Sequence, residues 1–494
     1  MIARLLDVIR ARGDAADALW RRSEQTVVMF EADRLKSAGA SEEAGVNLRV
    51  LHGGRVGVAG STAAGDAALD GLVDRALASA LLGEPVELVF PPASPLPPVS
   101  TFFDRAADAS LDALISIGRS VMERLAREGC QVNVAVERSV AETTVGNTAG
   151  AHGAYRSTGV SVSADVRRVG GGAGAAGAGG DDVLMVYDYY VGGDLPSDAD
   201  LDALVRSVET RLSLALRVVE PPHGALPVVF TPAGLAPVLL PLEQAFSGKA
   251  VLQGISPFAG RVGEQAFDPR FSFTDDAVTP AGPSSRPVDD EGVPSRVTRL
   301  VERGVVREFV YDLETAARAR AASTGHGRRG VFGKPGIAYT NLVVGAGPND
   351  VAARLNDVGA RLNDVGARHA VPPHHSAAPL RPPGSNGMGT RPNDSPAPAP
   401  FAGGLTDGID DGLVVDDLIG VGQGNVIGGA FSHPVGLAYR VRRGEILGRV
   451  KDAAVAGNAY EMLKAIGGFG SDGRWLGSRW APSVLFEGVS VARR

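Results

Sequence analysis

The chain has 494 residues, 44% of them apolar and 21% charged, which is the composition of a folded protein and excludes wholesale disorder. Its net charge of −7 argues against binding to a nucleic-acid backbone, and its 5% aromatic content argues against a stacking surface for single strands. The single cysteine, Cys130, can form neither an intramolecular disulfide nor a thiolate cluster, which favours a reducing cytoplasm.

The N-terminal half combines helical and strand patterns. Charged residues interrupt the apolar positions of the first ten residues, so this segment is predicted to be an amphipathic helix and not a signal peptide. Elsewhere, alternation of apolar residues predicts strands, and apolar spacings of three or four predict helices. The expected strands are Gln25–Phe30, Gly45–Leu51 and a series between Gln131 and Val191, and the expected helices are Ala64–Leu82, Ser110–Glu128 and one capped by Ser197.

The second half is dominated by short strands. Val218–Gly224 carries paired prolines and is predicted to separate two domains. The sequence therefore predicts an α+β protein, with an N-terminal mixed α/β domain at 1–220 and a β-rich, curved-sheet or barrel-like domain at 225–494. The expected strands of the second domain are Leu226–Phe230, Ser295–Leu300, Val305–Tyr311, Leu437–Val441, Glu445–Val450 and Ser483–Val489.

Three segments differ from the rest of the chain in amino-acid composition. Gly170–Gly180 is nearly all Gly and Ala and is predicted to be a mobile hairpin loop. At about 348–403 a duplicated heptad and a Pro-rich run predict a low-complexity surface insertion, and its His374 and His375 are interpreted as loop residues. The longest uncharged apolar stretch, Gly224–Leu242, contains four prolines, so no membrane span is expected.

Several ordered segments of the second half resemble the TldD/PmbA family. Among them are Val228-Val-Phe-Thr-Pro-Ala-Gly-Leu, Gly254-Ile-Ser-Pro-Phe-Ala-Gly-Arg-Val-Gly-Glu, Asp289-Asp-Glu-Gly-Val-Pro-Ser-Arg, Ser323-Thr-Gly-His-Gly and Ala456-Gly-Asn-Ala-Tyr-Glu-Met-Leu. The best-known members of this family form a two-subunit cytoplasmic metallopeptidase that trims peptides and small unfolded proteins. The resemblance therefore implies a role in proteolysis and a dimeric assembly.

The resemblance also implies where zinc would be bound in an active subunit. The family's ligands are two histidines of a His-Glu-x-x-x-His run and a cysteine near the C-terminus, which leave a position for an activated water. In this chain the motif positions hold Pro241, Leu242 and Phe246, and no late cysteine exists. The resemblance thus implies the PmbA/TldE-type subunit, with no metal bound by this chain and zinc expected in a partner subunit. Pro241 is also expected to break or displace the helix that begins at Thr231 and ends near Gly248.

Other polar clusters have structural and functional interpretations. The acidic runs Asp275-Asp276 and Asp289-Asp290-Glu291 are interpreted mainly as turn caps, although Glu291-Gly292 is a candidate for the family's peptide groove. Ser323, His326 and Arg328 lie in a segment predicted to be a solvated loop; they are candidate peptide-binding residues, or a hydrolytic Ser–His pair if an acid lies nearby. The loop at Gly422 has the wrong glycine spacing for a dinucleotide site.

Three functions remain open from the sequence. The first is the subunit described above, with no catalytic residue of its own, pairing with a TldD-like subunit or with itself and binding a peptide substrate. The second is a homo-oligomeric peptide-binding or scaffolding protein without peptidase activity. The third is an autonomous, metal-independent hydrolase that uses Ser323 and His326. Neither nucleic acid nor a membrane is an expected partner.

Overall fold

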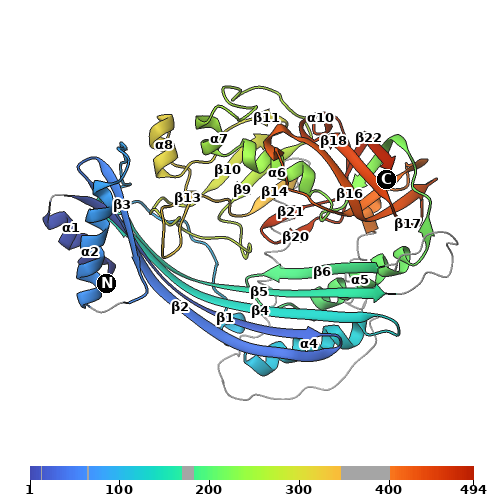
Figure 1. The fold of residues 1–494 in the computed structure, drawn as a ribbon, viewed down its shortest axis with the longest axis horizontal. Helices are drawn as coiled ribbons and strands as arrows, with labels where there is room; N and C mark the ends of the chain where they lie inside the picture. Colours follow the sequence, from blue (N-terminus) through green and yellow to red (C-terminus); the bar gives the residue numbers. More distant parts are fainter. Residues whose placement is uncertain (13, 64–65, 170–182, 346–400) are drawn as a thin grey trace, which may run out of the picture.

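A long curved sheet forms one side of the molecule, and a β-rich C-terminal part lies over it (Figure 1). The computed structural model describes residues 1–12, 14–63, 66–169, 183–345 and 401–494. The predicted loop at Gly170–Gly180, both histidines of the Pro-rich run and nearly all of the predicted insertion therefore lie outside the described residues.

The N-terminal sheet is antiparallel and has the strand order β3-β2-β1-β4-β5-β6. Its central strands are long, because each is hydrogen-bonded along most of its length to a neighbour. The elements of this part are α1 (Ile2–Ala11), β1 (Ala15–Glu31), β2 (Arg34–His52), β3 (Arg55–Ser61), α2 (Asp66–Leu81), α3 (Asp104–Ala107), α4 (Leu111–Leu125), β4 (Gln131–Asn147), β5 (His152–Val169), β6 (Val183–Gly192) and α5 (Asp198–Ala215).

Helices cover one face of this sheet, which we call the outer face. Apolar side chains of β1 and β2 pack against α1 and α2 at one end. Apolar side chains of β1, β4, β5 and β6 pack against α4 and α5 at the other end. Residues of the opposite parity point to the inner face, which is turned toward the C-terminal part. The helices thus cover the two ends of the outer face, while charged side chains such as Arg22 and Glu142 are exposed to solvent in its middle.

The C-terminal part contains a closed ring of strands. Strand β15 pairs with β8 in parallel and with β16 antiparallel, and β8, β22, β18 and β16 pair antiparallel in turn, which closes the ring. A second sheet has the order β11-β10-β9-β14-β21-β20. The elements are β7 (Val218–Val219), β8 (Gly224–Phe230), α6 (Ala236–Ala245), α7 (Gly248–Leu252), β9 (Ser272–Asp276), β10 (Val297–Glu302), β11 (Val305–Val306), α8 (Leu313–Ala319), β12 (Gly327–Arg328), β13 (Gly336–Ile337), β14 (Leu342–Gly345), η1 (Phe401–Gly404), β15 (Asp411–Leu418), η2 (Val426–Gly428), β16 (Ala430–Arg442), β17 (Glu445–Val450), β18 (Ala453–Asn458), α10 (Ala459–Met462), β19 (Ile466–Phe469), β20 (Arg474–Leu476), β21 (Arg479–Ala481) and β22 (Val484–Arg493).

The predicted α+β class, with a barrel-like C-terminal part, is confirmed. The predicted cap Ser197 is confirmed, since it forms a capping box with Asp200 at the start of α5. Ser110, the first residue of the expected helix, caps α4. The expected strand Val305–Tyr311 is shorter, because only Val305 and Val306 pair with β10. No helix in the described ranges is long and apolar enough to cross a membrane.

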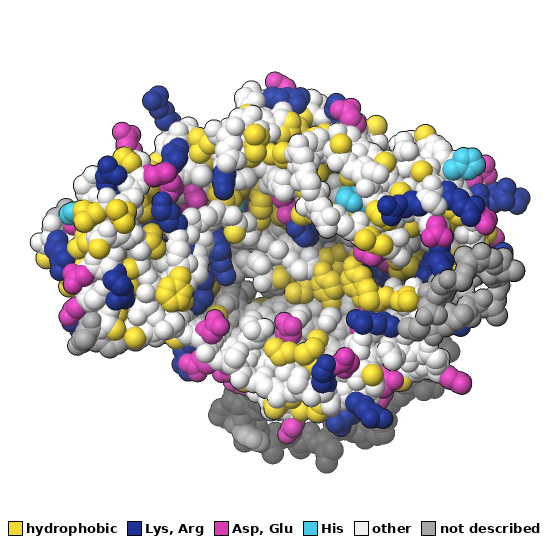
Figure 2. All heavy atoms as spheres, viewed as in Figure 1, with side chains coloured by type: hydrophobic (Ala, Val, Ile, Leu, Met, Phe, Trp, Pro, Cys, Tyr) yellow, Lys and Arg dark blue, Asp and Glu magenta, His cyan; other side chains and the backbone are white. Residues whose placement is uncertain are grey.

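A hollow separates the inner face of the sheet from the C-terminal part (Figure 2). Much of its floor consists of small side chains, such as Ser23, Ala141, Ser157 and Ser161, which occupy inner-face positions of β1, β4 and β5. Small residues leave space above a sheet that larger residues would fill. The sequence thus produces a concave surface and not a second packed layer over the middle of the sheet.

Candidate functional site

Helix α6 carries the positions at which the family's zinc motif was expected. The chain turns before it, where the Thr231 hydroxyl accepts the N–H of Gly234. The helix then runs without a break from Ala236 to Ala245, with Pro241 inside it, so the predicted break is wrong. The proline removes the bond to the Pro237 carbonyl, but the flanking apolar side chains are buried and hold the helix in place. Gly248 does not end this helix either; it begins α7.

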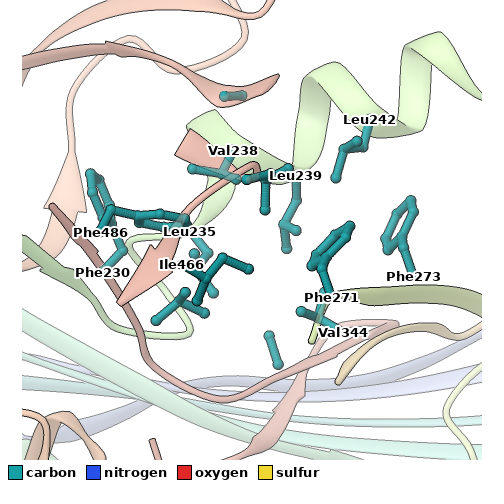
Figure 3. Close-up of a cluster of buried hydrophobic side chains, with 14 of the residues drawn as sticks. Phe230, Leu235, Val238, Leu239, Leu242, Phe271, Phe273, Val344, Ile466 and Phe486 are labelled. Carbon is teal, nitrogen blue, oxygen red and sulfur yellow. The ribbon is translucent and has the colours of Figure 1, made fainter. Parts of the chain in front are cut away.

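The residues at all three motif positions lie in the hydrophobic core. Leu242 and Phe246 are fully buried, and the Phe246 ring stacks on Phe258 and Phe309 at centroid distances of 5.2 and 5.5 Å. The carbonyl oxygen of the buried Pro241 accepts a hydrogen bond from the Tyr460 hydroxyl. Figure 3 shows Leu242 among aliphatic and aromatic side chains from α6, β9 and β14. The arrangement is that of a hydrophobic core, in which an ion would have no polar partner.

These residues do not fit zinc. None of the three side chains offers a nitrogen, oxygen or sulfur donor. The carboxylate on the same helix, Glu243, is engaged by the guanidinium of Arg479. Across the described residues, no group of three or more His, Cys, Asp or Glu side chains is placed to hold a metal ion.

A buried charged cluster joins the sheet to the C-terminal part. We define it by Asp17 and Arg49 of the sheet and by Asp290, Glu291 and Arg329 of the C-terminal part. Arg49 Nε donates to Asp17 Oδ1 at 3.0 Å, and Arg49 Nη1 donates to Glu291 Oε1 at 2.7 Å. Arg329 Nη1 donates to the same Asp17 oxygen at 2.8 Å, and its main-chain N–H donates to Asp290 Oδ2 at 2.9 Å. The cluster fixes one end of the hollow.

Burial perturbs the carboxyl groups of this region. It raises the pKa of Glu291 to about 8, with the carboxylates of Asp289 and Asp312 adding to the effect and the charge of Arg49 opposing it. Burial also raises the pKa of Asp289, which closes a turn by accepting the N–H groups of Glu291 and Val293. The interpretation of this acidic run as a turn cap agrees with the geometry of Asp289 alone, since Asp290 and Glu291 instead contact Arg21 and Arg49.

Of the two candidate residues, Glu291 belongs to this cluster and Gly292 follows it in the chain, so neither lies on the open floor of the hollow. Glu291 Oε2 accepts the Leu313 N–H at 2.7 Å, so both of its oxygens are occupied. Gly292 has a φ of +86°, a backbone conformation that favours glycine. Both positions therefore have structural reasons for their residue type.

The segment 323–329 is less exposed than predicted, since Thr324, His326 and Arg329 are buried. His326 Nδ1 lies 2.8 Å from Thr324 Oγ1 and 3.0 Å from the Thr324 carbonyl oxygen, while its Nε2 lies 3.7 Å from Asp275 Oδ2. Ser323 Oγ instead donates to the Tyr311 carbonyl at 3.2 Å. The structure thus places His326 near the acid Asp275, but the hydroxyl that contacts His326 is that of Thr324 and not that of Ser323.

Arg328 is the candidate with an accessible charge. Its side chain is half exposed, and its Nε lies 3.7 Å from Asp290 Oδ2. Asp290 is held mainly by Arg21 of β1, at 2.8 Å. Arg328 therefore retains donor groups that a carboxylate could use.

The other wall of the hollow was not predicted from the sequence. Strand β6 is the last strand in the pairing order, and its alternate side chains Val183, Met185 and Tyr187 are exposed on the inner face. Farther along the same face, Tyr189 lies near Arg479, which pairs with Glu243 of α6. Burial raises the pKa of Tyr187 to about 12, so its hydroxyl stays neutral at neutral pH. The Val-Met-Tyr alternation was the available signal.

Family models match two regions of the chain. Residues 223–366 and 388–493 match the PmbA/TldA metallopeptidase C-terminal domain, and residues 16–80 match the PmbA/TldA metallopeptidase domain 1. The chain belongs to the TldD/PmbA family. This assignment confirms the resemblance on which the interpretation of α6 depends.

Curated relatives agree with the family. A metalloprotease TldD homolog from Haemophilus influenzae is 32% identical over 158 residues, 32% of each chain. An uncharacterized protein from Methanocaldococcus jannaschii is 24% identical over 265 residues, 53% of this chain and 50% of that protein. The chain thus spans about half the length or less of these curated relatives.

Solved structures match over nearly the full length. A putative modulator of a DNA gyrase from Thermotoga maritima superposes with a TM-score of 0.79 at 21% identity, covering 99% of each chain. TldE from Thermococcus kodakarensis superposes with a TM-score of 0.78 at 21% identity, covering 98% of this chain and 99% of that one. These likenesses show that the fold is shared.

Proposed function

We propose that this chain is the PmbA/TldE-type subunit of a TldD-type metallopeptidase and does not itself bind the catalytic zinc. The observation that carries the proposal is the packing of α6, where Pro241, Leu242 and Phe246 fill the motif positions with buried apolar side chains. A family fold combined with an apolar core at the metal position points to a supporting role. The zinc and its activated water belong to a homologous TldD-like subunit.

The hollow supplies the surface for a peptide substrate. An extended peptide along β6 presents alternate side chains to Val183, Met185 and Tyr187, while its main chain follows the strand. This mode depends little on sequence and suits peptides and small unfolded proteins. At the opposite end of the hollow, Arg328 offers a charged group for a carboxylate. We assign the assembly to the reducing cytoplasm, where the single Cys130 remains a thiol.

An autonomous hydrolase is the second candidate, because His326 lies near the acid Asp275. Two features count against it. Ser323 hydrogen-bonds to a main-chain carbonyl, and His326 and Asp275 are both almost completely buried, so a substrate would have to displace packed protein to reach them. The peptide-binding scaffold uses the same hollow and differs from the main proposal only in having no catalytic partner.

Reconstitution tests the proposal. The purified, untagged chain is assayed alone and mixed with a TldD-type homologue from the same genome that carries the intact zinc motif, with an unfolded casein and short peptides as substrates. We expect hydrolysis only in the mixture, abolished by a chelator, and zinc by elemental analysis only in the partner. Stoichiometric zinc in the isolated chain would contradict the proposal. Chelator-resistant hydrolysis by the chain alone favours the hydrolase, and peptide binding with no hydrolysis in the mixture favours the scaffold.

A further inference from the structure

The free edge of the N-terminal sheet is unusually long. Strand β3 pairs only with residues 46–52 of β2, and within the described ranges no strand pairs with the same side of residues 34–45. All side chains from Arg34 to Glu43 are exposed. In Figure 1, β2 forms the outer border of the curved sheet over this stretch. An edge of this length presents a row of main-chain N–H and C=O groups to any strand that approaches it.

The sequence of this edge is complementary to itself in antiparallel pairing. Residues 36–42 read Lys-Ser-Ala-Gly-Ala-Ser-Glu, so the five central residues are a palindrome about Gly39. With two copies centred on Gly39, each Ser37 faces Ser41, each Ala38 faces Ala40, and each Lys36 faces Glu42. Opposite charges directly across a strand pair stabilise it. The same two charges would repel their own kind in a parallel arrangement, so the edge favours one orientation.

We propose that β2 pairs antiparallel with β2 of a second copy of this chain, with Gly39 on the two-fold axis. A two-fold contact of one surface with itself is the commonest way in which identical subunits assemble. The occupant is a second copy because the charge pattern matches this same edge read backwards. In the single subunit Lys36 pairs with Glu31 and Glu42 pairs with Arg22, so these neighbouring charges become part of the joint.

The pairing extends the sheet across both subunits. The axis runs perpendicular to the sheet, so the two inner faces lie on the same side and the two hollows open in the same direction. The joint lies away from β6 and from the closed ring of strands, which stay available to another subunit. The proposal goes beyond the peptidase role and stands or fails separately from it.

Cross-linking tests the register directly, in the full chain with Cys130→Ser to remove the native thiol. Gly39→Cys has free space around the new side chain and places two thiols opposite each other, so mild oxidation gives a covalent dimer. Ser41→Cys alone gives none, since its two copies lie about 14 Å apart along the strands. A mixture of Ser37→Cys and Ser41→Cys gives a covalent dimer again.

Charge exchange provides the second measurement, by sedimentation of the unmodified full chain. We expect a dimer whose dissociation constant rises at least tenfold in Lys36→Glu and in Glu42→Lys and returns toward the original value in the double variant. Ala40→Pro removes a main-chain N–H that points to the free edge, since the alternation of the ladder turns the even residues of β2 away from β1, and it abolishes the dimer while the circular dichroism spectrum is retained. A monomer at all concentrations, a dimer that survives Ala40→Pro, or cross-links that ignore the predicted register would each overturn the proposal.

Discussion

The most direct test of the zinc-free interpretation is removal of the Phe246 side chain. This ring is fully buried and contacts three others, with Phe258 and Phe309 stacked on it and Phe273 edge-on at a centroid distance of 6.4 Å. Phe→Ala in a packed core costs about 3–5 kcal/mol of unfolding free energy. The loss of three aromatic contacts, each adding about 0.5–1.5 kcal/mol beyond burial, places Phe246→Ala toward the upper end.

Equilibrium unfolding in urea, followed by far-UV circular dichroism and tryptophan fluorescence, measures this cost. With a slope of about 2 kcal/mol per molar urea, the midpoint falls by roughly 1.5–2.5 M. The matched control is Phe332→Ala, whose ring is 67% exposed and whose removal changes stability by less than about 0.5 kcal/mol. We also expect Phe246→His to be destabilised and not rescued by zinc, because no second ligand lies on the adjoining residues. Equal midpoints for Phe246→Ala and Phe332→Ala, or rescue of the histidine variant by zinc, would refute the reasoning.

Three further predictions follow from the contacts. Arg49→Ala removes the donor to the buried oxygens Asp17 Oδ2 and Glu291 Oε1 and lowers the free energy of unfolding by about 3–5 kcal/mol, whereas Arg22→Ala, which breaks an exposed pair, changes it by less than about 1 kcal/mol; similar urea midpoints would contradict this. Because the Glu291 carboxyl has a raised pKa in the folded state, the folded chain holds a proton that the unfolded chain releases, so stability falls as the pH rises from about 4.5 to about 8. Glu291→Gln flattens this part of the curve, and parallel curves for the two proteins would count against the assignment. Ser323→Ala leaves peptide hydrolysis by the mixture with a TldD-type subunit within about twofold, and a loss of a hundredfold or more would instead support the hydrolase.

The sequence predicts those parts of the fold that short-range rules determine. Caps such as Ser110 and Ser197 satisfy helix N–H groups only a few residues away, so their signals are local. The hairpin of β16 and β17 is likewise set by neighbouring residues. The full lengths of β1 and β2 were missed because residues 34–43 are exposed on both faces and show no alternation. Their strand conformation comes from the ladder with β1.

The candidate site was partly predictable. The loss of metal ligands at α6 is visible in the residue types alone, whereas an unbroken helix through Pro241 is not, because tertiary packing outweighs the local cost of proline. The burial of Arg329 was missed because its partner is far away in the sequence. Asp17 is 312 residues from Arg329. A polar loop that is buried against a distant charged residue has the same amino-acid composition as a loop exposed to solvent, so the sequence does not distinguish the two.

The charged cluster at the end of the hollow limits how this protein can change over evolutionary time. Its carboxyl and guanidinium groups come from separated stretches of chain, and each one is hydrogen-bonded to a neighbour away from water. A substitution at one of these positions leaves a buried polar group without its hydrogen-bond partner. A tolerated change at one position therefore requires a compensating change at another. Descendants of this chain should therefore keep all of these side chains together or replace them together, and covariation at these positions should be a lasting mark of how the sheet is attached.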